Sequence, residues 1–301
     1  MIRKQKAGIV CCSNGLSDNA YKELQHIKEI LEQMGITPVF SDFIYAKNGV
    51  RSGTARQRAD ALMKMYDNPE IDMIFDVSGG DIANEILDFL DYERIAKARN
   101  LEGQPKPFWG YSDLTVVLNA IYAKTGNSGV LYQVRHLAAA GNELRQQEFK
   151  ESICKEHENS LMEACAGGDK KNGLFSLSYE FLQGTQLSGI VVGGNIRCLL
   201  KLAGTPYFPD MTDKVLLLEA RSGLEPQMIT YLSQLKQLGV FENVNGILLG
   251  TFAQLGSQPE ELVKEFAGDM IPIVKTQNIG HAVDSKAIGI GKEINICCIK
   301  L

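Results

Sequence analysis

Ser112 is a candidate nucleophile because of its residue type and its position in the sequence. It follows the short apolar run Phe108–Tyr111 and precedes an apolar segment with helical character. A serine at a tight strand-to-helix turn presents its hydroxyl beside the first free N–H groups of the helix, which pairs a nucleophile with an oxyanion site. Ser and Asp are also favoured helix N-caps, and from this segment alone a capping role for Ser112 or Asp113 is the simpler interpretation.

A general base and a carboxylate occur later in the chain. There are only four histidines, and His281 directly follows a predicted strand at an irregular turn. Glu219 follows the four apolar residues Val215–Leu218, where a carboxylate is costly to bury unless a group such as an imidazole N–H pairs with it. A hydrogen-bonded structural histidine and a solvent-exposed glutamate are the alternatives. The order Ser, acid, His matches the G-x-S-x-G hydrolases, but Leu114 stands where that motif has its second glycine.

Alternating strands and amphipathic helices predict a parallel sheet for the first half of the chain. The predicted strands are Ala7–Cys12, Thr37–Asp42, Asp72–Val77 and Phe108–Tyr111. Helices are predicted around residues 24–34, 59–66, 82–90 and 113–124, the last ending at Gly126. Sites in such sheets form beyond the carboxyl ends of the strands, where Ser78–Asp81 and Gly110–Asp113 both lie.

The pattern changes near residue 145. We predict an N-terminal domain over residues 1–145, a linker or loop over 146–184 and a smaller α/β domain over 185–301. Strands of the second domain are predicted at Ser188–Val192, Lys214–Ala220, Gly246–Phe252, Ile271–Val274 and Glu293–Leu301, and helices at Ile196–Leu202, Gln227–Leu238 and Glu260–Glu265.

Composition limits the class of protein. The 301 residues carry a net charge of −5 and contain no cluster of Lys and Arg, which argues against nucleic acid or an anionic membrane as partner. No apolar run approaches the length needed to span a membrane, so a cytoplasmic location is expected. The seven cysteines are odd in number and lack a CxxC spacing, which is typical of reduced, mostly buried thiols.

Several ordered motifs resemble one known family, the LD-carboxypeptidases, which are serine peptidases that include murein tetrapeptide carboxypeptidases and microcin C self-immunity proteins. The resemblance covers most of the chain. It rests on Arg58–Ile71, Gly79-Gly80 with Leu90–Tyr92, Gly110–Gly126, Gly193–Asn195 with Leu202–Tyr207, Leu216–Glu219 and Gly280-His281.

The resemblance implies roles for individual residues. Ser112 would be the nucleophile, His281 its general base and Glu219 the partner that orients the base. Backbone N–H groups of Asp113 and of Gly80, in the Gly79–Gly80 turn, would form the oxyanion hole. The candidate substrate contacts are Gly79, Asp81, Asn195, Arg135 and His136.

The same resemblance implies a flavodoxin-like N-terminal domain, a smaller α/β domain, a site between them and a homodimer, with no metal or organic cofactor. The expected reaction is hydrolysis of an amide bond near a free carboxyl terminus, with an L-to-D peptide of murein as leading substrate. A peptidyl- or aminoacyl-nucleotide, as in microcin immunity, is the alternative substrate, and a ligand-binding homologue without activity is the alternative class.

Three positions depart from the family pattern and bear on the substrate. Ser78 stands where many members have an arginine before the glycine pair. Ala220 replaces the usual aspartate after the catalytic glutamate, and Leu131–His136 replaces an F-x-G-P-like segment.

Overall fold

The computed structural model describes residues 3–47, 49–155, 173–255 and 259–298. The chain divides into unit 1, Met1–Gln146, and unit 2, Gln147–Leu301. Both units combine helices with a largely parallel sheet, so the predicted α/β class is confirmed. The helix α5 (Glu143–Lys155) crosses the boundary, and residues 156–172 of the predicted linker lie outside the described residues.

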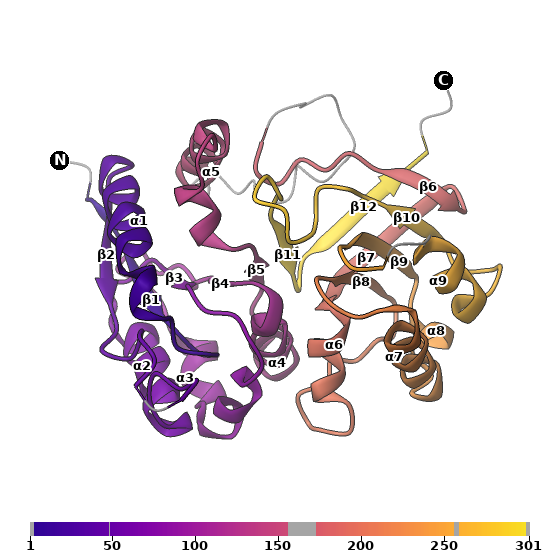
Figure 1. Cartoon of the computed structure of the whole chain (residues 1–301), viewed down its shortest axis with the longest axis horizontal. Helices are drawn as coiled ribbons and strands as arrows, with labels where there is room; N and C mark the ends of the chain where they lie inside the picture. The colour runs from indigo at the N-terminus through magenta and orange to yellow at the C-terminus, as the bar shows by residue number, and fades with distance from the viewer. Residues whose placement is uncertain (1–2, 48, 156–172, 256–258, 299–301) are drawn as a thin grey trace. The chain divides into compact units, whose positions relative to one another are not determined.

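The strands of unit 1 form a parallel sheet in the order β5-β4-β3-β1-β2 (Figure 1). They are β1 (Gln5–Val10), β2 (Ile36–Phe40), β3 (Met73–Asp76), β4 (Phe108–Gly110) and β5 (Gly129–Leu131). Each neighbouring pair is parallel. This is the 2-1-3-4-5 order of flavodoxin-like sheets, as the family resemblance implies.

Helices pack in two groups around this sheet. The helical elements are η1 (Asp18–Ala20), α1 (Tyr21–Gln33), α2 (Ala55–Asp67), η2 (Ala83–Phe89), α3 (Tyr92–Lys97), η3 (Ser112–Leu114), α4 (Thr115–Thr125) and η4 (Val134–Ala138). α1 contacts β2 and η4, whereas α2, α3, α4 and η2 contact one another. This division is that of a doubly wound domain.

Local sequence signals explain where two of these helices begin and end. Thr54 and Gln57 form a capping box at the start of α2, in which each side chain accepts a hydrogen bond from the backbone N–H of the other. Gly126 ends α4 in the left-handed conformation, with φ of +73°. The residues from Thr115 to Ile121 are all buried, so α4 is a central helix.

The structure corrects three element predictions in unit 1. β1 ends at Val10, so Cys11 and Cys12 belong to the following loop. The segment predicted as a helix over residues 82–90 is the 3-10 helix η2. β5, only three residues long, was not predicted.

Three loops follow the carboxyl ends of adjacent strands in unit 1. Cys11–Asn14 follows β1, Val77–Asp81 follows β3, and Tyr111 leads from β4 into η3. β3 pairs with both β1 and β4, and all three strands run in the same direction. The loops therefore emerge at one edge of the sheet, where sites form in folds of this class.

Unit 2 contains a mixed sheet in the order β12-β7-β8-β9-β10-β6. Its strands are β6 (Glu180–Gln183), β7 (Gln186–Asn195), β8 (Lys214–Ala220), β9 (Gly246–Phe252), β10 (Ile273–Lys275) and β12 (Glu293–Cys297), and the short β11 (Ile288–Ile290) contacts β7. The four central strands are parallel, and the edge strands β12 and β6 are antiparallel to their neighbours. β6, β11 and the short helix α8 were not predicted.

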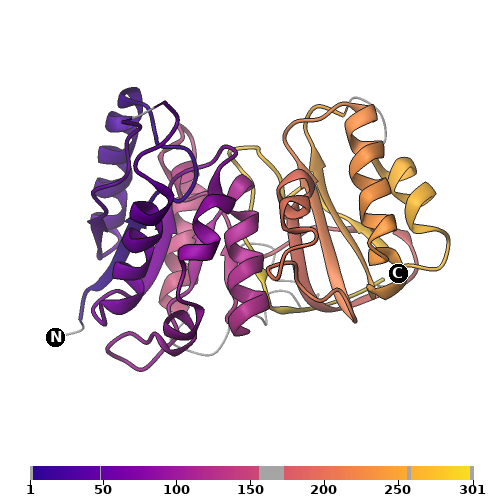
Figure 2. The same cartoon turned by 90° about the horizontal axis from the view of Figure 1, so that it is seen from below.

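The helical elements of unit 2 are α6 (Ile196–Leu199), η6 (Leu200–Leu202), α7 (Glu225–Gln237), α8 (Val240–Asn243) and α9 (Pro259–Ala267). α7 packs against α8 and α9, and Figure 2 shows α7 and α9 on the same side of the sheet. Among the helices of the described ranges, none has both the length and the apolar character needed to cross a membrane.

The cysteines agree only in part with the prediction of buried thiols. Cys11, Cys12 and Cys198 are buried. Cys297 and Cys298 are exposed, because Cys297 ends the edge strand β12 and Cys298 follows it.

A buried lysine fixes the end of α2 and leads to a pH-dependent prediction. Lys106 is 4% exposed, and its ammonium group donates to the carbonyl oxygens of Met65, Tyr66 and Asn68 at 3.3, 2.7 and 2.6 Å. Burial lowers the pKa of Lys106 from 10.5 to about 8. The folded state therefore disfavours the ammonium form, and this penalty is present in full below pH 8 and disappears as the pH rises to 10.5.

We expect the stability of the wild type relative to Lys106→Met to increase between pH 8 and 10.5. Urea unfolding midpoints of the two proteins at pH 7, 9 and 10.5 measure this difference. A difference that stays constant over this range would contradict the lowered pKa.

Candidate active site

Ser112 occupies a strained turn between β4 and α4. Because Ser112 is the predicted nucleophile, we call Tyr111–Leu114 the nucleophile turn. Ser112 has φ of +58°, a left-handed conformation that costs a non-glycine residue about 1–2 kcal/mol. The backbone N–H of Leu114 donates to the carbonyl of Tyr111 at 3.1 Å and closes the turn. Strain of this kind persists only where the surroundings hold it and is concentrated at functional sites.

The capping interpretation of Ser112 does not fit this turn. Tyr111 and Leu114 occupy the N-cap positions of η3 and α4, and neither makes a side-chain capping bond. Ser112 is instead the first residue of η3, and it is half-buried.

Glycine is required on one side of the serine only. A Cβ on Gly110 would lie 2.6 Å from the Cβ of Leu114, so the side chain of Leu114 packs directly over Gly110. Leu114 thus fills the space that a side chain at position 110 would need. The absence of the second glycine of the G-x-S-x-G motif is explained by this packing.

Asp113 anchors the nucleophile turn to two other loops. Its carboxylate is fully buried, and Oδ2 accepts from the hydroxyl of Ser13 at 2.6 Å and from the backbone N–H of Ala83 at 2.8 Å. A buried carboxylate is costly without such partners. Hydrogen bonds to a charged group contribute about 1.5–3 kcal/mol each.

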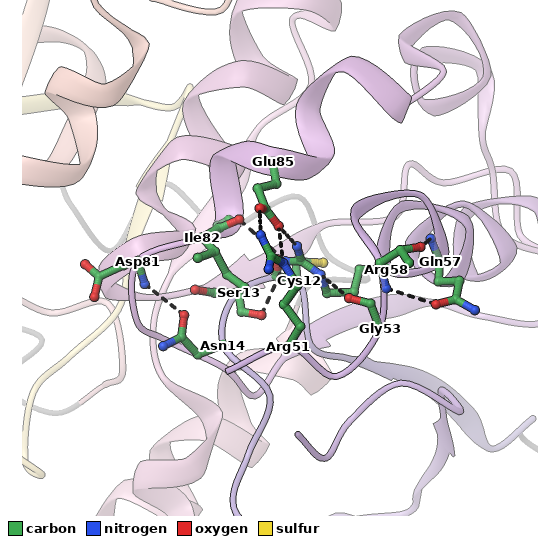
Figure 3. A network of polar contacts seen from close by, with 12 residues as sticks. Cys12, Ser13, Asn14, Arg51, Gly53, Gln57, Arg58, Asp81, Ile82 and Glu85 are labelled. Atoms are coloured by element: carbon green, nitrogen blue, oxygen red, sulfur yellow. Dashed lines mark hydrogen bonds and ion pairs between the residues drawn. The ribbon is translucent and has the colours of Figure 1, made fainter. Parts of the chain in front are cut away.

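The predicted oxyanion turn follows β3. We call Ser78–Asp81 the glycine turn. Gly80 has φ of +127°, and a Cβ there would lie 2.2 Å from Cγ of Asn14, so only glycine fits. Asn14 donates its backbone N–H to the carbonyl of Gly79 at 3.2 Å, and its Oδ1 accepts from the N–H of Asp81 at 3.1 Å (Figure 3).

The side chain of Ser78, the residue that departs from the family pattern, connects the end of β3 to the loop after β1. It is fully buried, and its hydroxyl donates to the Asp76 carboxylate while accepting from the backbone N–H of Ser13 at 3.0 Å. Burial raises the pKa of Asp76, whose Oδ2 also accepts from the N–H of Cys12 at 2.7 Å. The side chain at position 78 therefore belongs to the interior of unit 1.

A buried arginine on α2 supports the loop after β1 (Figure 3). Arg58 is 1% exposed and donates to the carbonyl oxygens of Cys12 and Ser13 at 2.5 and 3.4 Å. Its guanidinium also pairs with Glu85, which pairs in turn with Arg51. Hydrogen bonding from Arg51 and the charges of both arginines hold the pKa of Glu85 below its usual value.

Two of the predicted substrate contacts lie on η4. The guanidinium of Arg135 pairs with Glu23, with Nε and Nη2 at 2.9 and 2.6 Å from the two carboxylate oxygens. The His136 ring lies 6.4 Å from the Tyr111 ring and 6.2 Å from the Tyr132 ring, between centroids. The charge of Arg135 is thus already compensated by a carboxylate, whereas His136 lies near the nucleophile turn.

In unit 2, Glu219 and His281 form a buried pair. Glu219 lies near the end of β8 and is fully buried, and the side chain of His281 is 12% exposed. Nδ1 of the imidazole lies 2.9 Å from Oε2 of Glu219. Of the alternatives that the sequence leaves open, a solvent-exposed glutamate is therefore excluded, because the Glu219 carboxylate is buried against the imidazole of His281.

Close backbone packing places the loop that carries His281. The N–H of Thr251 donates to the carbonyl of Ile279 at 2.8 Å, so the loop lies against β9. A Cβ on Gly280 would lie 1.8 Å from Oγ1 of Thr251, and a Cβ on Gly250 would lie 2.5 Å from the oxygen of Ile279. Glycine at both positions therefore allows His281 to reach Glu219.

Asn195 ends β7 beside the glutamate strand. It faces Glu219 in the parallel register of β7 and β8. Its Oδ1 accepts from the N–H of Cys198 at 3.3 Å and caps α6. A capping role is thus established for this predicted substrate contact.

The two units match two consecutive family models. Residues 7–133 match the LD-carboxypeptidase N-terminal domain, and residues 188–296 match the LD-carboxypeptidase C-terminal domain. The chain belongs to the LD-carboxypeptidase family. Membership confirms the predicted family and enzyme class, a carboxypeptidase-type hydrolase.

Similar proteins match most of the length of this chain. YocD of Bacillus subtilis (strain 168) is 28% identical over 284 residues, covering 88% of this chain and 84% of YocD. The microcin C7 self-immunity protein MccF of Escherichia coli is 25% identical over 299 residues, covering 89% and 83%. The murein tetrapeptide carboxypeptidase of Pseudomonas aeruginosa is 25% identical over 275 residues, covering 87% and 84%.

The fold is also that of solved structures. The structure of the microcin C7 self-immunity protein MccF in complex with aspartyl sulfamoyl adenosine has a TM-score of 0.82 at 23% identity, and the match covers 99% of this chain and 94% of that one.

The sequence analysis missed the residues that hold these two turns in place. Ser13 and Asn14 directly follow β1, and Arg58 lies in the interior of α2. Position at the carboxyl end of a parallel strand, the signal that singled out the other two loops, would have identified Ser13 and Asn14 as well.

Proposed function

We propose that this protein is a Ser-His-Glu hydrolase that releases the terminal residue from an L-to-D peptide of murein. The observation that carries the proposal is the combination of a strained serine, Ser112, with a buried imidazole–carboxylate pair, His281 and Glu219, in a chain of this family. Serine hydrolases on unrelated folds use the same three groups.

The proposed reaction proceeds by acyl transfer. Nε2 of His281 takes the hydroxyl proton of Ser112 while Oγ attacks the carbonyl carbon of the scissile amide. Nδ1 of His281 lies 2.9 Å from Oε2 of Glu219, and this carboxylate favours the tautomer that carries its proton on Nδ1, in which Nε2 accepts the proton of Ser112. The tetrahedral oxyanion is stabilised by the backbone N–H groups of Asp113 and Gly80.

The reaction is then completed in two steps, formation of the acyl-enzyme and its hydrolysis. The C–N bond breaks, and the leaving amine takes the proton from His281. Water, deprotonated by the same imidazole, attacks the carbonyl carbon of the acyl-enzyme. The ester C–O bond to Oγ then breaks, Oγ takes the proton from His281, and the shortened peptide leaves with a free carboxyl group.

A second substrate class is an aminoacyl- or peptidyl-nucleotide. This alternative is favoured by the similarity to MccF and by Ser78, which stands where many carboxypeptidases of the family have an arginine. Because Ser78 is buried and bonded to Asp76, it cannot supply the positive charge that an arginine would offer to a carboxylate of the substrate. The cytoplasmic location and the homodimer implied by the family resemblance remain predictions.

Mass spectrometry of reaction products tests the proposal. The purified protein is incubated with muropeptide tri-, tetra- and pentapeptides and with an aminoacyl sulfamoyl adenosine. We expect loss of the terminal D-alanine from the tetrapeptide, and no product from the same mixture with Ser112→Ala. Cleavage of the nucleotide alone would favour the alternative substrate. Binding of either compound without turnover would instead indicate an inactive homologue.

A further inference from the structure

Ser13 and Asn14 connect the two turns that the proposed mechanism uses. We infer that this dipeptide is a positioning element: it holds the nucleophile turn and the glycine turn in a fixed relation, so that Ser112 and the oxyanion donors stay aligned. The inference rests on the proposed function. The dipeptide and both turns lie in unit 1.

Ser13 acts on the nucleophile turn through Asp113. Its hydroxyl donates at 2.6 Å to Oδ2 of Asp113, the residue that follows the serine. Both side chains are fully buried, so no solvent can replace this bond if it is lost. Because Asp113 also supplies a proposed oxyanion N–H, movement of its side chain would shift both the donor and Ser112.

Asn14 acts on the glycine turn from the same loop. It holds the turn at two points, donating to the carbonyl of Gly79 and accepting from the N–H of Asp81. These bonds lie on either side of Gly80, the other proposed oxyanion donor. The side chain of Asn14 also packs where a Cβ of residue 80 would be.

The loop that carries the dipeptide is itself fixed. The N–H groups of Cys12 and Ser13 donate to the side chains of Asp76 and Ser78, and their carbonyl oxygens accept from Arg58. Four buried hydrogen bonds therefore hold the backbone from which the two side chains project. Because this loop is rigid, it keeps the nucleophile turn and the glycine turn in a fixed position relative to each other.

The strain at Ser112 explains why this positioning element is needed. A non-glycine residue with φ of +58° relaxes toward negative φ unless its neighbours prevent it. Without the hydroxyl of Ser13, one of the bonds that hold Asp113 is lost and the turn can relax. The expected effect falls on kcat, since a displacement of about 1 Å at reacting groups costs about 100-fold in rate.

The test compares Ser13→Ala with the wild type and with Ser52→Ala. Ser52 is also fully buried, but its hydroxyl lies beside the Cys11 thiol. We expect Ser13→Ala to lower kcat by about 10- to 100-fold with KM within about threefold, and to slow labelling of Ser112 by a fluorophosphonate probe by a similar factor. Ser13→Thr, which keeps the hydroxyl, should recover most of the rate, and Ser52→Ala should match the wild type.

The outcomes separate this inference from the proposed function. If the wild type is neither labelled at Ser112 nor active, the proposed function fails and the inference fails with it. If the wild type is labelled and Ser13→Ala reacts equally fast, only the inference is overturned. A lower melting temperature with unchanged kcat at 25 °C would also overturn it, because that is the result of a merely structural role.

A second variant covers the case in which Ser13→Ala does not fold. Asn14 is only half-buried, so Asn14→Ala should be tolerated better. It is expected to lower kcat at unchanged KM by loosening the turn around Gly80. A kcat equal to that of the wild type would overturn the inference.

Discussion

Replacing Ser112 with glycine is expected to stabilise the protein while abolishing its activity. Glycine adopts φ of +58° without steric cost, so Ser112→Gly should raise the free energy of unfolding by about 1 kcal/mol. The same change removes the nucleophile, and the loss of kcat should be about 10,000-fold or more. Ser112→Ala keeps the strain and should lose activity at nearly unchanged stability.

A second left-handed residue offers a matched control. Asp213, in unit 2, has φ of +60° and is exposed. Asp213→Gly should relieve strain in the same way and leave turnover intact. Urea unfolding and steady-state kinetics of the three variants measure both effects. Full activity in Ser112→Gly would rule out this serine as the nucleophile, and a loss of stability would show that the turn is not strained.

Replacing Glu219 with glutamine is expected to lower kcat by about 10,000-fold with little change in KM. Glutamine has nearly the same shape, but its amide can donate a hydrogen bond to Nδ1 of His281. That bond favours the tautomer with the proton on Nε2, so the imidazole can no longer accept the proton of Ser112. The expected defect is therefore chemical, with the fold and the binding of substrate retained.

Glu260 provides the control for a change from carboxylate to amide in the same unit. It is also largely buried, and its carboxylate pairs with Lys275. Glu260→Gln should retain the turnover of the wild type. Steady-state kinetics on the substrate identified by product analysis give kcat and KM for both variants. A kcat of Glu219→Gln within tenfold of the wild type would show that Glu219 does not orient the base.

The order of strands and helices in unit 1 was largely predictable, because each strand of four or more residues has a clear apolar run. β5 (Gly129–Leu131) was missed, whereas the equally short β4 was predicted from the apolar run that precedes Ser112. The 3-10 form of η2 was also missed. Its first N–H, from Ala83, donates to Asp113, a contact thirty residues away that local periodicity cannot indicate.

The groups proposed to react could be selected by residue type, whereas the residues that hold them in place could not. Ser112, Glu219 and His281 have side chains of the types that hydrolases use, and they follow one another in the order Ser, acid, His. Ser13 and Asn14 are small polar residues without charge, common in loops, and their importance comes from partners on other strands. Arg58 lies on an ordinary amphipathic helix, and nothing in its neighbourhood in the sequence shows that it is buried.

The bond between Ser13 and Asp113 has a consequence for the folding of the enzyme. It joins residues 100 positions apart, so it cannot form until β1, β3 and β4 have been made and paired. Contacts of such long range form at a high cost in chain entropy and generally late. A nascent or partly unfolded chain therefore leaves Ser112 in a relaxed backbone, and the turn that the proposed mechanism uses forms only with the completed sheet.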